Sequence, residues 1–412
     1  MKQALPREVT IQLEKIVNIQ SLRAFFQPIM SVTGKKILGL EGLIRGVNPS
    51  DGKLIMPFEL FSAANTQTLL IDLDRACRES ILSAFVSYHE IDPDLLLFLN
   101  IDTAIIDTVG GSDFLDEQVN RYGINPQNIV IEINESKSKN SDSLNRFVKR
   151  YKERGYLIAL DDVGAGFSNM DRIAEIKPDI IKIDRSIIMN IDKIYHKQEI
   201  FKSQVNLANK IGALIVAEGV EGREEAIAVL KLGAQVIQGF YFARPSDDFA
   251  LKAELVAKAA QALEDFKAML MAELVQYNEK RLAYTRTVNG LIKALIVADT
   301  EAAFDALLMK ALDGIEHIDC AYVLNQAGIQ CSETVNTYQG YVGDKRVFRS
   351  ANNGVDHSIK NFYFNLVKHG QDTYISEPYV SMATGHLCVT YSRVFNLTNG
   401  KYVLCVDFLH DQ

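Results

Sequence analysis

Polar side chains recur inside or directly after short apolar runs in the first 245 residues. A polar residue in such a run is unusual, because burying it costs free energy unless it finds a partner. Seven successive runs carry at least one, and the set is Glu41, Asn100, Glu132, Asp161 with Asp162, Lys182, Glu218 and Gln238. Lys182 is the only cation in this set, so internal ion pairs would leave most of the carboxylates without a counter-charge.

Divalent cations are the simplest source of the missing positive charge. Oxygen ligands without His or Cys are typical of hard ions such as Mg²⁺, Mn²⁺ or Ca²⁺. Several carboxylates can hold two such ions, and paired ions recur in enzymes that hydrolyse phosphodiesters. A glycine-rich turn with Gly164 and Gly166 follows the Asp pair. These glycines would permit a tight loop close to the metals. These features indicate a phosphoryl substrate.

The runs that carry these residues predict eight strands, at 24–30, 37–45, 95–101, 129–133, 156–160, 180–183, 213–217 and 235–240. Helical patterns lie between them, at 69–88, 142–154, 168–175, 195–211 and 221–232. Alternating strands and helices of this number fit a (β/α)8 TIM-like barrel, in which functional residues collect at the carboxyl ends of the strands. Only SVTGKK joins the first two strands, which is too short for a crossover helix and predicts one antiparallel strand.

Two segments follow the barrel, so we divide the chain into residues 1–246, 247–298 and 299–412. The middle segment has no proline and a single glycine, Gly290, and is rich in helix-forming residues. It predicts either one long linker helix or two shorter helices broken near Asn289-Gly290. The last segment reads as an α+β domain, with helices at 301–312 and 358–368 and strands at 321–325, 373–375, 387–395 and 402–408.

Bulk composition narrows the class of protein. A net charge of −8 argues against a nucleic-acid polymer or an anionic membrane surface as partner. The chain has no run of 18 apolar residues, and its N-terminus lacks the apolar core of a signal peptide. Five cysteines without C-x-x-C spacing are typical of reduced thiols. We therefore expect a cytoplasmic protein with no membrane attachment and, on general grounds, a homodimer.

The motifs around these residues resemble those of the EAL family. Glu41-Gly-Leu-Ile-Arg45 resembles the E-A-L-x-R signature, with glycine in the alanine position. Further stretches that resemble family motifs are FLNID around Asn100, EINES (132–136), DDVGAGFSN (161–169), IKID (181–184), AEGVE (217–221) and QGF (238–240). The resemblance spans about residues 20–245 and is specific as a set.

The resemblance implies hydrolysis of the second messenger cyclic di-GMP to linear pGpG with two Mg²⁺ or Mn²⁺ ions. Carried over position by position, the metal ligands would be Glu41, Asn100, Glu132, Asp161, Asp162 and Glu218. The catalytic set would be Lys182, which orients or activates the attacking water, with Glu218, Gln238 and Glu135, the last tethering the loop at 162–169. Substrate contacts would come from Gln27, Leu43 and Arg45.

The departures from the family pattern remove no metal ligand. Gly42 replaces alanine, Asn134 stands where threonine is usual, and Val163 where phenylalanine is usual. We therefore expect an active phosphodiesterase. The alternatives are a receptor that binds cyclic di-GMP with weak or no turnover, and a scaffold that acts through residues 247–412.

The C-terminal segment resembles PAS/Cache-like sensor modules that follow some EAL domains. This resemblance rests on Tyr374-Ile-Ser-Glu-Pro-Tyr379, Ala383-Thr-Gly385 and the terminal YVLCVDF. It implies an unidentified small-molecule ligand that regulates the barrel, with Arg349, Tyr379 and Thr384 lining the pocket. A folded dimerisation domain without a ligand is the alternative.

Overall fold

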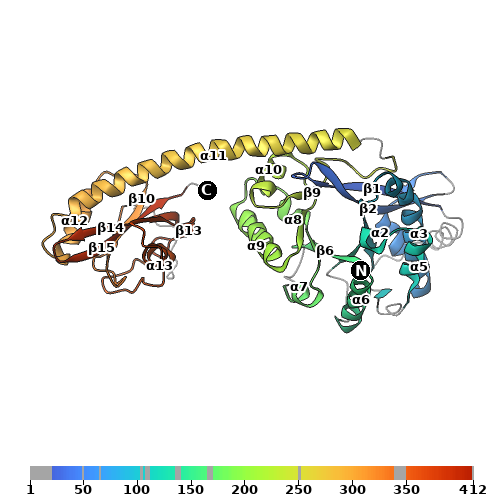
Figure 1. Cartoon of the computed structure of the whole chain (residues 1–412), viewed down its shortest axis with the longest axis horizontal. Coiled ribbons are helices and arrows are strands. Elements are labelled where there is room, and N and C mark those ends of the chain that lie inside the picture. The colour runs from blue at the N-terminus through green and yellow to red at the C-terminus, as the bar shows by residue number, and fades with distance from the viewer. Residues whose placement is uncertain are drawn as a thin grey trace. The chain divides into compact units, whose positions relative to one another are not determined.

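The computed structural model describes residues 21–48, 51–64, 66–102, 105–106, 112–134, 141–164, 170–248, 252–337 and 349–410. The chain forms two compact units, Met1–Met269 and Leu270–Gln412 (Figure 1). None of the helices in these described ranges is both long and apolar enough to cross a lipid bilayer.

The first unit is a closed barrel of eight strands. They are β1 (Leu22–Ser31), β2 (Lys36–Val47), β4 (Leu96–Ile101), β5 (Ile129–Asn134), β6 (Leu157–Val163), β7 (Ile180–Ile183), β8 (Leu214–Ala217) and β9 (Val236–Gln238). Strand β1 pairs antiparallel with both β2 and β9, and every other neighbouring pair in the ring is parallel. The eight predicted strands and the single antiparallel strand are confirmed. A short strand, β3 (Leu54–Ile55), pairs antiparallel with the end of β2 and was not predicted.

Helices cover the outside of the barrel (Figure 1). The five predicted helices correspond to α3 (Gln67–Ile91), α6 (Ser141–Glu153), α7 (Met170–Ile176), α9 (Tyr195–Ile211) and α10 (Arg223–Lys231). The sequence pattern missed four short elements, namely α2 (Pro57–Ala63), α5 (Phe114–Arg121), η1 (Pro126–Asn128) and α8 (Arg185–Ile188). Short helices are hard to predict, because they show too few turns for a helical period to emerge.

Side chains fill the barrel interior in layers. An apolar layer consists of Ile29, Phe98, Val130, Ala159, Ile180, Val216 and Val236. Two positions further along each parallel strand come Asn100, Glu132, Asp161, Lys182, Glu218 and Gln238. Because side chains on a strand alternate between faces, this spacing of two places the polar residues directly above the apolar layer. The antiparallel β1 reaches the same level two positions before Ile29, at Gln27, which pairs with Glu41 across the β1–β2 ladder.

Gly42, which stands in the family's alanine position, is closely covered by Ile81 of α3. A Cβ atom on Gly42 would lie 2.4 Å from Cγ2 of Ile81, far inside van der Waals contact. Ile81 is buried in the barrel core, and its β-branched side chain has few alternative rotamers. The missing methyl group of Gly42 is therefore compensated by a neighbour that occupies its space.

We predict that Gly42→Ala lowers the free energy of unfolding by about 1–3 kcal/mol, the usual cost of overpacking a core. The loss should largely disappear when Gly42→Ala is compared in an Ile81→Ala background, as urea unfolding of the four variants would show. Gly290→Ala is the control, because an added Cβ there meets nothing within 4 Å. Equal losses in both backgrounds would contradict the contact.

A single helix, α11 (Lys252–Leu295), follows the barrel and is 44 residues long. It continues unbroken through Asn289-Gly290, so the first of the two predicted alternatives is correct. Its first turns pack on the barrel core through Leu255, Ala259 and Ala262. Its last turns pack on the core of the second unit through Val288, Leu291 and Leu295.

The second unit is built on an antiparallel sheet in the order β11-β10-β15-β14-β12, with β13 paired to β14. Its elements are η3 (Glu301–Ala303), α12 (Phe304–Leu312), β10 (Ile318–Asn325), β11 (Val335–Asn336), α13 (Asn361–Lys368), β12 (Thr373–Ile375), β13 (Tyr379–Val380), β14 (Leu387–Leu397) and β15 (Gly400–Leu409). The predicted helices and strands of this segment are all present. The predicted turns at 326–328 and 399–400 are also found.

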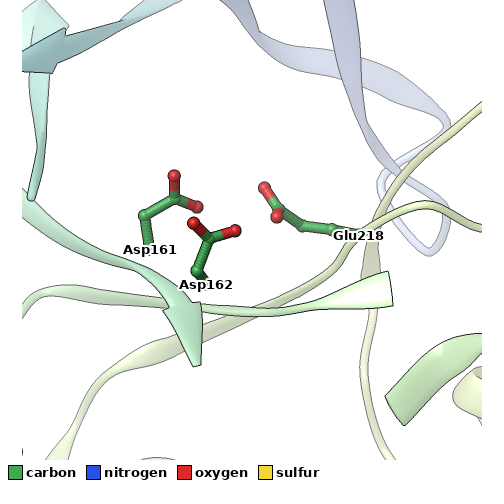
Figure 2. A group of neighbouring side chains, drawn as sticks. All are labelled: Asp161, Asp162 and Glu218. Carbon is green, nitrogen blue, oxygen red and sulfur yellow. The ribbon is translucent and has the colours of Figure 1, made fainter. Parts of the chain in front are cut away.

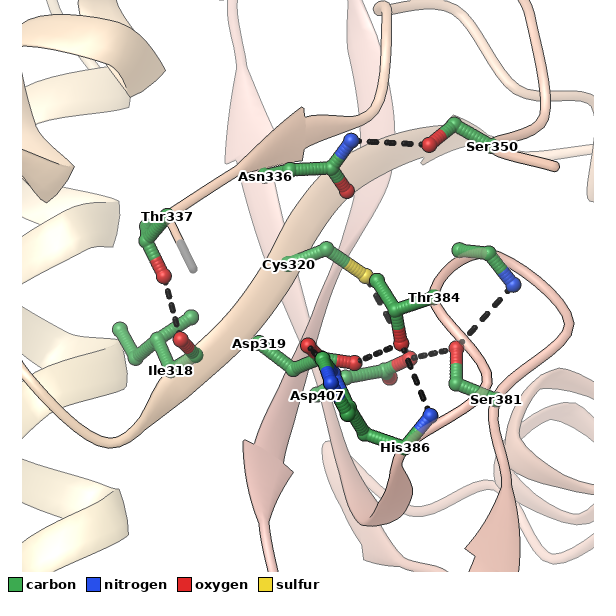
Figure 3. Close-up of polar contacts among 11 residues, drawn as sticks. Ile318, Asp319, Cys320, Asn336, Thr337, Ser350, Ser381, Thr384, His386 and Asp407 are labelled. Carbon is green, nitrogen blue, oxygen red and sulfur yellow. Dashed lines mark hydrogen bonds and ion pairs between the residues drawn. The ribbon is translucent and has the colours of Figure 1, made fainter. Parts of the chain in front are cut away.

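A network of buried polar side chains ties the segment after β13 to this sheet (Figure 3). Asp407 accepts hydrogen bonds from Thr390 Oγ1 at 2.8 Å and from Ser381 Oγ at 3.3 Å. Asp319 pairs with Thr384 Oγ1 and with His386 Nδ1, the latter at 2.8 Å. Both carboxylates are almost fully buried. Burial raises the pKa of Asp407, and the hydroxyl donors offset only part of this effect.

We predict that Asp407 makes the second unit less stable as the pH rises. The raised pKa means that the folded chain holds this proton more tightly, so the stabilisation is complete below about pH 4 and is lost as the pH rises through the folded pKa. Urea unfolding of wild type and Asp407→Asn from about pH 4 to about pH 8 should show a difference that grows in favour of the variant. The exposed Asp372→Asn is the control. A pH-independent difference would contradict the assignment.

Candidate active site

A cavity of about 310 Å³ opens at the end of the barrel where the polar layer lies. It is lined by Gln27, Glu41, Asp161, Asp162, Lys182, Asp184, Arg185, Glu218, Gly219, Glu221, Gln238, Gly239 and Phe240. Seven of these residues belong to the site predicted from the sequence. The cavity volume falls at the lower end of the range for small-molecule sites.

A β-bulge brings the two consecutive aspartates to the same cavity. The register of β6 with β7 shifts between Leu160 and Val163, and Asp162 adopts a left-handed backbone conformation with φ +57°. In a regular strand, Asp161 and Asp162 would point to opposite faces, so the bulge is what directs both inward. One carboxylate oxygen each from Asp161, Asp162 and Glu218 lies within 4.8 Å of the others, and Figure 2 shows these groups facing one another.

Lys182 lies at the centre of the acidic residues. Its Nζ is 2.5 Å from Glu218 Oε1, 3.3 Å from Asp161 Oδ1 and 3.8 Å from Glu41 Oε2, and it also pairs with Glu132 Oε1. The side chains of Lys182 and Glu132 are buried, with 1% and 0% exposed. Strand β7 therefore places a single ammonium group against carboxylates from four other strands or strand ends.

The charges of this group do not balance. Five carboxylates, from Glu41, Glu132, Asp161, Asp162 and Glu218, surround one ammonium, so the fully ionised group has a formal charge of −4. Two divalent cations would neutralise it.

The pKa values of these groups reflect the same imbalance. Burial raises the pKa of Glu132 well above its usual range despite Lys182, and burial raises the pKa of Glu218 to about 8. Burial by itself would lower the pKa of Lys182, but the surrounding carboxylates outweigh it and raise that pKa. The carboxylates therefore need more positive charge than Lys182 supplies.

The oxygen atoms also fit a hard metal ion. Both carboxylate oxygens of Glu132, Oδ1 of Asp161 and Oε1 of Gln238 are buried and accept no well-formed hydrogen bond from any described residue, although Lys182 attracts Glu132 and Asp161 electrostatically. Asn100 Nδ2 donates to Glu41 Oε1 at 3.0 Å, and Gln238 Nε2 donates to Glu41 Oε2 at 2.5 Å. Buried acceptors without donors are what a cation site requires.

The remaining predicted residues lie away from this centre or outside the described residues. Leu43 and Arg45 follow Glu41 at alternate positions of β2 and do not line the cavity; Arg45 Nη1 donates to the carbonyl of Ile44. Glu135 lies outside the described residues. Asn134, which replaces the usual threonine, donates to the carboxylate of Asp162, so this departure supports the Asp pair instead of weakening it.

The sequence-based prediction missed four of the lining residues with side chains, namely Asp184, Arg185, Glu221 and Phe240. Asp184, Glu221 and Phe240 are the last residues of the IKID, AEGVE and QGF motifs, and Arg185 follows IKID directly. Their motifs were recognised, but nothing in the local pattern indicated that their side chains turn toward the cavity.

Comparison with known proteins places this barrel in a family. A family model described as the EAL domain matches residues 11–245, which is more than half of the chain. The chain belongs to the EAL family. Its EAL domain is 29% identical over 240 residues to YkuI, an uncharacterised EAL-domain protein of Bacillus subtilis, with 58% of each protein covered. It is 26% identical over 253 residues to RocR, a cyclic di-GMP phosphodiesterase of Pseudomonas aeruginosa, with 59% of this chain and 64% of RocR covered. The chain thus spans less than two thirds of the length of these relatives.

Solved structures agree with the EAL assignment. The crystal structure of the Bacillus subtilis YkuI protein in complex with substrate c-di-GMP and calcium matches with a TM-score of 0.79 at 22% identity, over 97% of this chain and 99% of that one. This similarity shows the fold, and it covers the second unit as well as the barrel. A calcium/cy-diGMP complex of Klebsiella pneumoniae BlrP1 matches the EAL domain with a TM-score of 0.51 at 25% identity, over 60% of this chain and 59% of that one.

We predict that Glu132→Gln raises the melting temperature in EDTA, because it removes a buried negative charge from a group with a charge excess. The same variant should lose most of the increase in melting temperature that we expect Mn²⁺ to give to the wild type, since it removes a candidate metal ligand. Thermal melts with EDTA and with Mn²⁺ measure both effects. Glu264→Gln, on the exposed surface of α11, is the control and should behave as wild type. A lower melting temperature in EDTA with an unchanged response to Mn²⁺ would refute the prediction.

Proposed function

We propose that the chain is an active phosphodiesterase that hydrolyses cyclic di-GMP to linear pGpG with two Mg²⁺ or Mn²⁺ ions. The observation that carries this proposal is the group of five carboxylates around a single buried ammonium, open to a cavity in an EAL domain. The cyclic di-GMP phosphodiesterase activity of the relative RocR supports the choice of substrate.

Six side chains would hold the ions, namely Glu41, Asn100, Glu132, Asp161, Asp162 and Glu218. Bound divalent ions supply Lewis-acid polarisation of the phosphoryl oxygen and a water of lowered pKa. Lys182 is protonated in this environment, so it donates hydrogen bonds and orients an oxygen atom at the centre of the site. Gln238 holds Glu41 in place, because its Nε2 donates to Glu41 Oε2; the same Nε2 also donates to Gln27 Oε1 at 3.3 Å.

We also propose roles for residues whose function the geometry leaves open. Leu43 and Arg45 would contact the substrate from half-buried positions on β2, and Glu135 would tether the loop at 162–169. We keep the division into residues 1–246, 247–298 and 299–412, in which the long helix links the barrel, as effector, to the second unit, as sensor. The protein would act as a homodimer in the cytoplasm. The fold similarity to YkuI covers nearly the whole chain, which supports treating the second unit as a domain that accompanies the barrel in both proteins.

The second unit would act as a PAS/Cache-like sensor of an unidentified small molecule. Two of the hydroxyl groups expected in its pocket are engaged within the protein, since Tyr379 pairs with Thr390 at 2.7 Å and Thr384 pairs with Asp319. A ligand that reaches them must therefore replace these bonds.

We predict that the full chain converts cyclic di-GMP to pGpG in Mg²⁺ or Mn²⁺ and that no pGpG forms in EDTA. Chromatographic separation of the two nucleotides measures this conversion. Recovery of intact cyclic di-GMP after calorimetric binding would instead identify a receptor, and no binding at all would favour a scaffold.

Glu41→Ala and Lys182→Ala should fail for different reasons. Loss of Glu41 removes a metal ligand and should weaken Mn²⁺ binding and abolish turnover. Loss of Lys182 leaves the oxygen ligands in place, so metal and substrate should still bind while kcat falls. Calorimetry with Mn²⁺ alongside steady-state kinetics separates the two, and an equal loss of metal affinity in both variants would contradict these roles.

A further inference from the structure

The rim of the cavity carries a cation that the metal site does not use. Six carboxylates line the cavity, from Glu41, Asp161, Asp162, Asp184, Glu218 and Glu221, and the cations among the described lining residues are Lys182 and Arg185. Lys182 is 1% exposed and lies among four carboxylates, whereas the side chain of Arg185 is 48% exposed. Arg185 is therefore the lining cation that an incoming anion can reach.

The backbone holds Arg185 in a defined position. It is the first residue of α8, directly after Asp184, whose side chain caps the helix by accepting a hydrogen bond from Ser186 N at 2.8 Å. Its aliphatic stem crosses Gly219, where an added Cβ would lie 2.6 Å from Cβ and 2.7 Å from Cγ of Arg185. Gly219 also has φ +65°, a conformation that favours glycine. Any other residue at 219 would displace the arginine.

The guanidinium group has one ion-pair partner in the described structure, Glu221, with Nη1 and Oε1 2.5 Å apart. Both side chains are at least 40% exposed, so solvent screens the pair and little free energy is needed to separate or share it. A guanidinium carries five N–H donors in a planar fork, which leaves donors for a phosphate even while Glu221 is bound. Glu221 thus keeps the side chain at the rim in the absence of ligand.

We propose that Arg185 is a substrate-positioning residue that binds a phosphate group of the dinucleotide at the rim of the cavity. This inference rests on the proposed function, because cyclic di-GMP carries two phosphodiester groups and must enter a cavity lined mainly by carboxylates. A contact at the rim is made in the ground state and in the transition state alike. Arg185 therefore lowers KM and leaves kcat nearly unchanged.

The test compares Arg185→Gln, Arg185→Lys and Glu221→Gln in the full chain. Arg185→Gln should raise KM for cyclic di-GMP at least tenfold with kcat within about threefold of wild type, and should weaken binding of cyclic di-GMP in Ca²⁺ by the same factor. The KM of Arg185→Lys should lie between those of the wild type and Arg185→Gln, because lysine keeps the charge but loses the planar fork. Glu221→Gln should lower KM, since it removes a competitor for the guanidinium. Mn²⁺ affinity should be unchanged in all three variants.

Arg223→Gln is the matched control, because Arg223 is also an exposed arginine in an ion pair, with Asp265, but does not line the cavity. Wild-type KM in Arg185→Gln, or a fall in kcat without a change in KM, would overturn the inference while the proposed function stands. A rise in KM for Glu221→Gln as large as that for Arg185→Gln would assign the contact to Glu221 instead. A wild-type chain that neither binds nor cleaves cyclic di-GMP would overturn the proposed function and this inference together.

Discussion

One unbalanced electrostatic interaction underlies the rest of this structure: a single ammonium, from Lys182, shares the inside of the barrel with five carboxylates. Burial makes each uncompensated charge expensive, which is why the pKa values of Glu132 and Glu218 are raised. The charge of this group is balanced only if cations bind to it. The carboxylate group therefore destabilises the barrel locally, and the proposed divalent ions would relieve this destabilisation.

Regular strand geometry creates most of this convergence, and one irregularity completes it. The polar layer arises because each parallel strand places its polar residue two positions after an apolar one, above a packed floor. The bulge in β6 then adds a second carboxylate from the same strand, at the cost of a left-handed conformation at Asp162. Without the bulge, Asp162 would point away from Glu218 and the site would have one proposed ligand fewer.

The second unit handles buried carboxylates differently. Asp407 is as deeply buried as the barrel carboxylates, but hydroxyl groups from Thr390 and Ser381 satisfy its oxygens. Asp319 accepts a hydrogen bond from Thr384 Oγ1 and lies 2.8 Å from His386 Nδ1, so both of its oxygens have polar partners within the protein. A carboxylate surrounded by donors needs no ion and serves to hold a segment in place. The same residue type thus acts as a structural tie in one unit and as a proposed ligand in the other, depending on what faces it.

By itself, the sequence determined the eight barrel strands, their antiparallel member, the long helix as one of two possibilities, and the set of polar residues at the strand ends. These features follow from local periodicity and loop length, which one stretch of chain carries alone. Only the tertiary structure decided that Asp161 and Asp162 face the same cavity, that Lys182 meets four carboxylates, and that Ile81 fills the space above Gly42. The rim position of Arg185 over Gly219 belongs to the same group. Each of these depends on backbone irregularities or on contacts between residues distant in the chain, and no local pattern encodes such contacts.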